Sequence, residues 1–482
     1  MENTNTTKTS AFITLVSVFF FWGFVAASND ILIPVFKEKL HLLQWQSQMI
    51  SFAFYVAYTV GSIIYFFISK SAKEDILNRI GYKNGISLGL LISAIGTLLF
   101  YPAAQTASFS LMISGLFIVG LGFSLQQIAA NPLAINLGDP KKGSQRLSLA
   151  GGINNVGTTI GPLLVSFAIF GTVSVSTKAV ASIESIKTPY LFLGLAFIIV
   201  ALIFKFSSIP NKIIPEVETS DSNSSVKERK MALNYPQLWM GMIGIFVYVG
   251  VEVSTASNLP EFLRQHVGIS TDKVAPFVSL FWASLMIGRW TSSVGAFNIK
   301  GGLKAIMNFL MPYLAFGVFM IVNKIANHDI TPFYYYAFVI IVLILADFLS
   351  KGNPARQLLL FSLIGITALF VGMLSNGMVS AYAFMSVGLF CSTLWPCIFT
   401  LAIAGLGKHT NTGSSFLVMM IMGGGVISLT QGALSSDNLL GIQWSYLVGV
   451  CCFAYLAFYA FKVKNILKSQ GIDWSKPKTV NH

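Results

Sequence analysis

Charged residues are scarce in this chain of 482 residues. Aspartate, glutamate, lysine and arginine make up 10% of it, whereas soluble domains carry about 25%. Hydrophobic residues make up 54%, and the mean hydropathy is +0.71. A soluble core cannot absorb so much apolar sequence without leaving large exposed apolar patches. The composition therefore excludes an ordinary soluble protein and predicts a chain that lies in a lipid bilayer.

Residues that hold metals or act as catalysts are also few. The four cysteines lie inside apolar runs, without zinc-binding spacing or the framework of a secreted disulfide protein. The five histidines fall in loops or at the C-terminus and form no HExxH-like cluster. No glycine run is followed by Lys-Ser or Lys-Thr, so there is no P-loop. We expect no cofactor, no metal site and no enzymatic activity.

Apolar runs long enough to cross a bilayer, about 20 residues each, occur in two groups. The first group is 11–34, 49–69, 84–104, 109–137, 147–173 and 189–208. The second group is 237–263, 274–297, 302–323, 332–350, 356–375, 378–406, 413–434 and 442–462. The segment 210–230 between them is polar, charged and rich in serine, which is typical of a solvated linker. The pattern predicts an all-α membrane protein with about 14 transmembrane helices.

The net charge of +13 would suit a nucleic-acid partner, but its distribution indicates membrane orientation instead. Lysines and arginines sit in short segments between the apolar runs. Most of these 31 residues fall on one side of the membrane if the N-terminus is cytoplasmic, as the positive-inside rule requires. We therefore expect cytoplasmic N- and C-termini, a bilayer environment and no nucleic-acid partner.

A weak internal repeat relates the two groups of spans. The first span contains ASND (27–30) before Pro34, and the first span after the linker contains ASNL (256–259) before Pro260. The segment 120–132 similarly resembles 388–396, each ending in proline. Related halves joined by a linker are typical of a transporter with its site between them at mid-membrane.

Two carboxylates, Asp30 and Glu252, lie deep in the spans that open the two halves. An ionised aspartate at a helix centre costs about 2.5–3.5 kcal/mol, so each should face a water-filled cavity or a partner. Binding and release of a proton or another cation is the function that fits this placement, and hydrogen bonding between packed helices is the alternative. Asp347 lies near a helix end beside Lys351, and we interpret it as a structural residue at the membrane interface.

Amides and tryptophans inside the spans provide the groups that a sugar needs. Amide side chains donate and accept hydrogen bonds, and aromatic rings cover the C–H face of a sugar. Hydrogen bonding between helices is the alternative for the amides, and core or lipid packing is the alternative for the rings. Gln127 and Asn131, four residues apart, share one helix face. The other candidates are Asn154, Asn155, Trp22, Trp282 and Trp395.

Four segments together resemble the fucose permease family of the major facilitator superfamily. They are NDILIP (29–34), LQQIAANP (125–132), GR (288–289) and GSSF (413–416), the last leading to three glycines at 423–425. The resemblance covers about 11–298 and 355–435 and implies two six-helix halves. On this basis the first half is 1–208, the linker 209–236, the second half 237–298 and 354–464, and the tail 465–482. The segment 299–353 is an inserted helix pair.

The resemblance implies a sugar–cation symporter that works by alternating access. Asp30 matches the family's first-helix aspartate, which serves proton coupling and sugar binding, and Asn154 matches an asparagine near the sugar. Gln127 stands where the fucose permease has a second essential carboxylate, and Ala26 and Ala27 replace asparagines. Glutamine at 127 together with Glu252 looks more like the glucose/galactose branch.

The sequence therefore predicts a monomeric importer of a monosaccharide in the bacterial inner membrane. Asp30 and Glu252 are the predicted coupling residues for a proton or sodium ion. The predicted sugar-binding residues are Asn29, Asp30, Gln127, Asn131, Asn154, Glu252, Asn258, Trp282 and Trp395. The alternatives are an uncoupled sugar facilitator and a membrane sugar sensor or enzyme on a transporter fold.

Overall fold

A computed structural model of the chain describes residues 9–39, 44–170, 184–207, 209–211, 229–270, 273–296, 299, 301–436 and 438–474. In part of these ranges only the backbone is described, namely at 9, 26–39, 44–51, 54, 140, 162–163, 165–170 and 184–186. The described residues form helices, turns and bends, with no β-strand among them. The expected all-helical architecture is confirmed.

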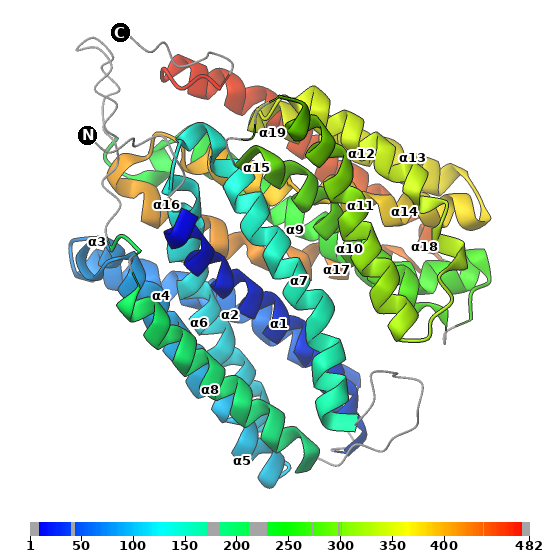
Figure 1. Ribbon diagram of the computed structural model, residues 1–482, viewed down its shortest axis with the longest axis horizontal. Helices are drawn as coiled ribbons and strands as arrows, with labels where there is room; N and C mark the ends of the chain where they lie inside the picture. Colours follow the sequence, from blue (N-terminus) through cyan, green and yellow to red (C-terminus); the bar gives the residue numbers. More distant parts are fainter. Residues whose placement is uncertain are drawn as a thin grey trace.

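The described residues of the first half form eight α-helices that pack mainly on one another (Figure 1). Their bounds are α1 Thr9–Lys39, α2 Gln44–Ser71, α3 Ile76–Ile80, α4 Tyr82–Leu98, α5 Phe100–Gln105, α6 Phe109–Asn136, α7 Gly143–Phe170 and α8 Glu184–Phe206. A short 3-10 helix, η1, covers Pro140–Lys142 between α6 and α7.

The second half follows the linker and runs from green to red in Figure 1. Its α-helices are α9 Pro236–Phe262, α10 Ala275–Ser293, α11 Gly301–Ile325, α12 Tyr336–Ser350, α13 Pro354–Leu374, α14 Gly377–Cys391, α15 Leu394–Ile403, α16 Thr410–Met419, α17 Gly423–Leu434, α18 Gly441–Trp444 and α19 Leu447–Ser469. The short helices are η2 Ala232–Asn234, η3 Leu263–Val267, η5 Val294–Ala296, η6 Thr331–Phe333, η7 Gly407–His409 and η8 Met420–Met422.

Ten helical stretches among the described residues are long and apolar enough to cross a membrane. The helices α1, α2, α7 and α10 lie where the other four crossings are predicted. Together they agree with the expected count of about 14. The protein is therefore a multi-pass membrane protein.

Glycines let α1 and α7 approach each other closely. A Cβ atom at Gly23 would lie 1.9 Å from the carbonyl oxygen of Asn154, and one at Gly157 would lie 2.3 Å from that of Phe20. Small residues give this kind of close contact between membrane helices, where dispersion attraction replaces the hydrophobic effect. The contact fixes α7 against the helix that carries Asp30.

Two prolines leave backbone carbonyls free inside the bundle, because proline has no N–H to donate to the carbonyl four residues earlier. Pro132 in α6 frees the carbonyl of Ile128, which accepts a hydrogen bond from Ser414 Oγ of α16 at 2.9 Å. Pro396 in α15 frees the carbonyl of Ser392, at the break between α14 and α15. Both prolines belong to the segments that the internal repeat relates.

The helices α11 and α12 occupy the predicted insertion and pack against α10, α13 and α14. Their outer faces carry exposed apolar side chains, including Ile306, Leu314, Phe338 and Leu345. Such faces are suited to contact with lipid.

Candidate functional site

Glu252 lies in the middle of α9, where its carboxylate accepts a hydrogen bond from the hydroxyl of Tyr248 one turn earlier. The Tyr248 ring is buried, and its centroid lies 6.3 Å from that of the half-buried Trp395. The guanidinium of Arg289 on α10 attracts the Glu252 carboxylate electrostatically. A carboxylate in such surroundings can bind and release a small cation as its neighbours move.

Arg289 also connects the two halves. Its Nη1 donates hydrogen bonds to Asn155 Oδ1 at 2.8 Å and to the Gly151 carbonyl at 3.4 Å, both on α7. Its Nε donates to the Ser392 carbonyl at 3.0 Å. From the sequence this arginine is only part of a family motif, because its partners on α7 and at Ser392 lie more than 100 positions away.

Gln127 and Asn131 lie one helical turn apart on α6, as predicted. Gln127 Nε2 donates to the Tyr58 hydroxyl of α2 at 3.0 Å. Asn131 is only 1% exposed, and its Nδ2 has no hydrogen-bond partner among the described residues. Leaving a buried amide donor unpaired costs about 1–3 kcal/mol. This amide can therefore gain energy by donating to a ligand hydroxyl once the helices around it part.

Two of the other predicted amides already have backbone partners. Asn154 Nδ2 donates to the Phe19 carbonyl at 2.9 Å and so ties α7 to α1. Asn258 Nδ2 donates to the Ser254 carbonyl at 2.9 Å within α9. Both amides keep an oxygen that can act as an acceptor. Their roles in sugar binding stay predictions.

The remaining predicted residues are not brought together with Glu252 by any described contact. Asn29 and Asp30 belong to α1, and their side chains lie outside the described residues. Trp282 on α10 is 38% exposed and packs edge-on against Phe281, with ring centroids 5.5 Å apart.

Gln126 is a buried amide that the sequence does not single out. Its Oε1 accepts a hydrogen bond from Trp22 Nε1 at 2.6 Å, and its Nε2 donates to Ser93 Oγ at 2.9 Å. All three side chains are buried. Trp22 is thus part of the core between α1, α4 and α6. The neighbouring Gln127 lies about 100° away around the same helix, and only the packing shows which amide faces the core.

A group of polar residues joins the two halves at one end of the bundle. We call it the Asp75–Asn411 cluster, and it comprises Tyr65, Asp75, Asn78, Tyr82, Asn411 and Thr412. Asn411 of α16 accepts from the Tyr82 hydroxyl at 2.5 Å and donates to Asp75 Oδ1 at 3.1 Å and Asn78 Oδ1 at 2.9 Å. Asp75 also accepts from the backbone N–H of Leu77 and so caps α3. The cluster holds α16 against the first half.

Nearby serines and a threonine extend this contact along α2. Ser415 Oγ donates to the Ser62 carbonyl at 3.1 Å, and Thr59 Oγ1 donates to the Met419 carbonyl at 3.3 Å. Both bonds join α2 of the first half to α16 of the second. A bundle held together by side-chain hydrogen bonds at one end can separate there when those bonds are exchanged for water.

Asp347, predicted to be structural, lies on α12 within the second half. Its Oδ1 accepts a hydrogen bond from Gln357 Nε2 of α13 at 2.9 Å. Lys304 on α11 attracts the carboxylate electrostatically. These interactions attach α11 and α12 to the rest of the bundle.

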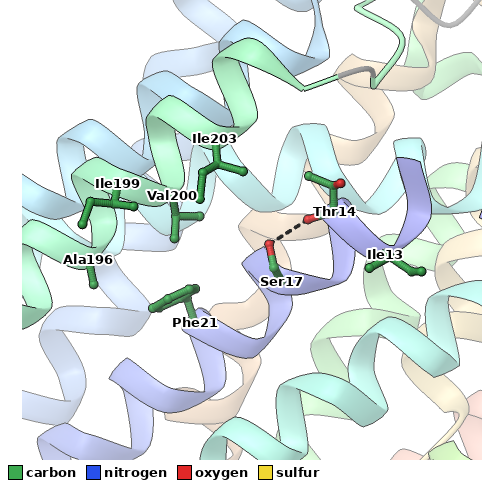
Figure 2. A pocket seen from close by; sticks show the side chains of 8 residues that line it. All are labelled: Ile13, Thr14, Ser17, Phe21, Ala196, Ile199, Val200 and Ile203. Carbon is green, nitrogen blue, oxygen red and sulfur yellow. Dashed lines mark hydrogen bonds between the residues drawn. The ribbon is translucent and has the colours of Figure 1, made fainter. Parts of the chain in front are cut away.

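An apolar groove of about 500 Å³ lies between α1 and α8 (Figure 2). Thr14 and Ser17 are the polar residues among the described ones that line it, and their hydroxyls donate to the carbonyls of Ser10 and Thr14 in their own helix. Isoleucine, valine, alanine and phenylalanine line the rest. The groove therefore offers nothing to recognise a sugar.

Comparison with known proteins agrees with this architecture. A profile of the family described as the Major Facilitator Superfamily matches residues 11–346. The chain is 34% identical over 451 residues to a protein of Brucella abortus named glucose/galactose transporter, covering 93% of each chain. It is 26% identical to the L-fucose-proton symporter of Escherichia coli, covering 93% of this chain and 92% of that protein.

The fold matches a solved structure of a transporter of the same kind. The crystal structure of FucP, a Major Facilitator Superfamily transporter in the outward conformation, superimposes with a TM-score of 0.71 at 24% identity. The match covers 94% of this chain and 98% of that one. At this level of identity the likeness concerns the fold alone.

Proposed function

Because the chain belongs to the major facilitator superfamily, we propose that it imports a monosaccharide of the glucose or galactose type by symport with a cation. It is a transporter and not an enzyme. The observation that carries the proposal is the 34% identity, over 93% of both chains, to a protein named glucose/galactose transporter. Glucose and galactose differ at one hydroxyl, and amide side chains, which both donate and accept, suit such ligands.

Within this proposal, Asp30 and Glu252 bind the coupling ion, a proton or sodium. Gln127, Asn131 and Asn154 bind sugar hydroxyls, and Trp395 beside Tyr248 offers an aromatic face. The unpaired Nδ2 of Asn131 supports this assignment, since a ligand hydroxyl would relieve its desolvation cost. Asn29, Asn258 and Trp282 complete the proposed set. Alternating access exposes these groups to each side of the membrane in turn.

We also propose that the protein works as a monomer in the bacterial inner membrane with both termini in the cytoplasm. The excess of basic residues in the segments on one side supports this orientation. No cofactor beyond the coupling ion is proposed.

Counterflow of radiolabelled hexoses in proteoliposomes tests the proposal. Wild-type protein should exchange glucose or galactose without a gradient and should accumulate the sugar when a proton or sodium gradient is imposed. Exchange without accumulation would instead identify an uncoupled facilitator, and the lack of any hexose exchange would contradict the sugar assignment.

Asp30→Asn tests the coupling role. It should abolish gradient-driven accumulation, because an amide takes up no proton near neutral pH and offers a sodium ion no negative charge. Asp329→Asn is a matched control, since Asp329 lies in the loop between α11 and α12 and its carboxylate accepts hydrogen bonds from Thr331 in the same loop. Unchanged accumulation in Asp30→Asn would refute the role of Asp30.

A further inference from the structure

Arg289 holds a position that the proposed roles of Asp30 and Glu252 leave unexplained. It projects from α10 of the second half and donates to Asn155 and Gly151 on α7 of the first half. A Cβ atom at Gly151 would lie 3.2 Å from Arg289 Cδ, so the side chain lies directly against the α7 backbone. The arginine therefore bridges the two halves at Gly151, where any larger side chain would crowd it.

The third acceptor of Arg289 comes from its own half. The carbonyl of Ser392 is free because Pro396 has no N–H to donate to it. Arg289 Nε donates a hydrogen bond to this carbonyl at 3.0 Å. The guanidinium is thus anchored on one side to the break between α14 and α15 and on the other side to α7.

A guanidinium stays protonated under all ordinary conditions, and a charge within a membrane bundle pairs with backbone carbonyls or with an opposite charge. All three hydrogen-bond acceptors of Arg289 are neutral oxygens. Among the residues whose side chains are described, the carboxylate that this guanidinium attracts electrostatically is that of Glu252 on α9. The other titratable groups that act on Glu252 or respond to its charge are the Tyr248 hydroxyl, which donates to it, and the Cys391 thiol.

Glu252 and α7 therefore compete for the same guanidinium. While the Glu252 carboxylate is ionised, it attracts the guanidinium of Arg289 towards α9 and so weakens the hold of α7 on it. Once a cation neutralises the carboxylate, only the neutral acceptors on α7 and at Ser392 remain for the guanidinium. The contact between α7 and α10 then becomes stronger.

We propose that Arg289 is a positioning residue that transmits the charge of Glu252 to the contact between α7 and α10. This inference rests on the proposed cation symport. Occupation of Glu252 by the ion then favours the arrangement of the two halves seen in this structure. Arg289 also opposes the ion electrostatically, so it sets the ion concentration at which the transporter is half-saturated.

The test is the ion dependence of hexose counterflow in proteoliposomes, with pH or sodium varied equally on both sides. Arg289→Gln removes the positive charge, so half-maximal exchange should need a roughly tenfold lower ion concentration, the size expected from losing a nearby charge in a partly buried site. Arg289→Lys keeps the charge and should stay close to wild type in this value. It also serves as the second variant if Arg289→Gln does not fold.

Two comparisons separate charge from packing. Trp290→Phe removes the neighbouring hydrogen bond of 3.3 Å from Trp290 Nε1 to the Gly152 carbonyl of α7, without changing any charge. It should leave the half-saturating ion concentration unchanged. In a Glu252→Gln background, adding Arg289→Gln should cause no further shift, because the carboxylate on which Arg289 acts is absent.

The outcomes also separate this inference from the symport proposal. If wild-type counterflow shows no dependence on protons or sodium, the symport proposal itself fails. If the wild type depends on the ion but Arg289→Gln leaves the half-saturating concentration unchanged, only the role of Arg289 is overturned. A shift that persists in the Glu252→Gln background, or an equal shift in Trp290→Phe, would likewise overturn it.

Discussion

Replacing Asn411 by alanine removes three side-chain hydrogen bonds that join α16 to the first half. The Asn411 side chain is buried and accepts from Tyr82 while donating to Asp75 and Asn78. All three partners belong to the first half, so the substitution acts on the contact between the halves. The arrangement held by the Asp75–Asn411 cluster should lose stability relative to one in which this end of the bundle is open.

The magnitude follows from the type of bond. A neutral hydrogen bond contributes about 1 kcal/mol net, and one to a charged group about 1.5–3 kcal/mol. Two neutral bonds and one bond to the Asp75 carboxylate together amount to roughly 3–5 kcal/mol. Water fills part of the space in the variant, so we expect about 3 kcal/mol. This changes the ratio of closed to open molecules by on the order of a hundredfold.

Distance measurements between spin labels report this ratio directly. Exposed residues Arg79 on α3 and Lys464 on α19, one in each half, can be changed to cysteine and labelled in a background where exposed Cys451 is serine. Asn411→Ala should shift the distance distribution towards longer values. An unchanged distribution would refute the view that this cluster holds the halves together.

The matched control for this experiment is Thr410→Ala, one residue away on the same helix. The Thr410 hydroxyl donates to the Gly407 carbonyl of its own half. Its loss should therefore leave the distance distribution as in the wild type. A shift of equal size in this control would show that any disturbance of the start of α16 opens the bundle.

Two further predictions concern the packing around α1. Trp22→Phe keeps an aromatic ring but removes the donor to Gln126, so the free energy of unfolding should fall by about 1–3 kcal/mol, measured as a lower thermal midpoint in detergent; an unchanged midpoint would contradict this. Gly23→Ala places a methyl group 1.9 Å from the Asn154 carbonyl oxygen and should greatly reduce the yield of monodisperse protein in size-exclusion chromatography. Gly302→Ala, whose added methyl group would meet no other described part of the chain within 4 Å beyond its own helix backbone and chain neighbours, should behave as wild type, and equal yields for both variants would refute the close contact.

Hydropathy predicted the crossings well because a bilayer of fixed thickness demands a minimum apolar length. The predicted spans 109–137 and 237–263 coincide closely with α6 and α9. A window of about 20 residues cannot detect a break of a single turn. The predicted span 378–406 is accordingly two helices, α14 and α15, and 413–434 contains α16, η8 and α17.

The hydrogen-bond partners of individual polar residues could not be predicted from the sequence, because they depend on how the helices face one another. Gln126 and Gln127 are adjacent and chemically identical, yet one bonds Trp22 in the core and the other bonds Tyr58. The Asp75–Asn411 cluster joins residues more than 300 positions apart. No local spacing relates such residues.

The two prolines show how the weak internal repeat acquires a physical meaning in three dimensions. Pro132 and Pro396 occupy related places in the two halves, and each deprives a carbonyl four residues earlier of its helical donor. A buried carbonyl without a partner is costly, so each must find another donor. The Ile128 carbonyl accepts a hydrogen bond from Ser414 of the opposite half. The Ser392 carbonyl accepts one from Arg289, which also donates to Asn155 on α7. In both cases the carbonyl that the proline leaves without a helical donor accepts a hydrogen bond from a side chain that contacts both halves. The two prolines therefore allow the halves to bind each other, and exchanging those donors for water would let the halves separate.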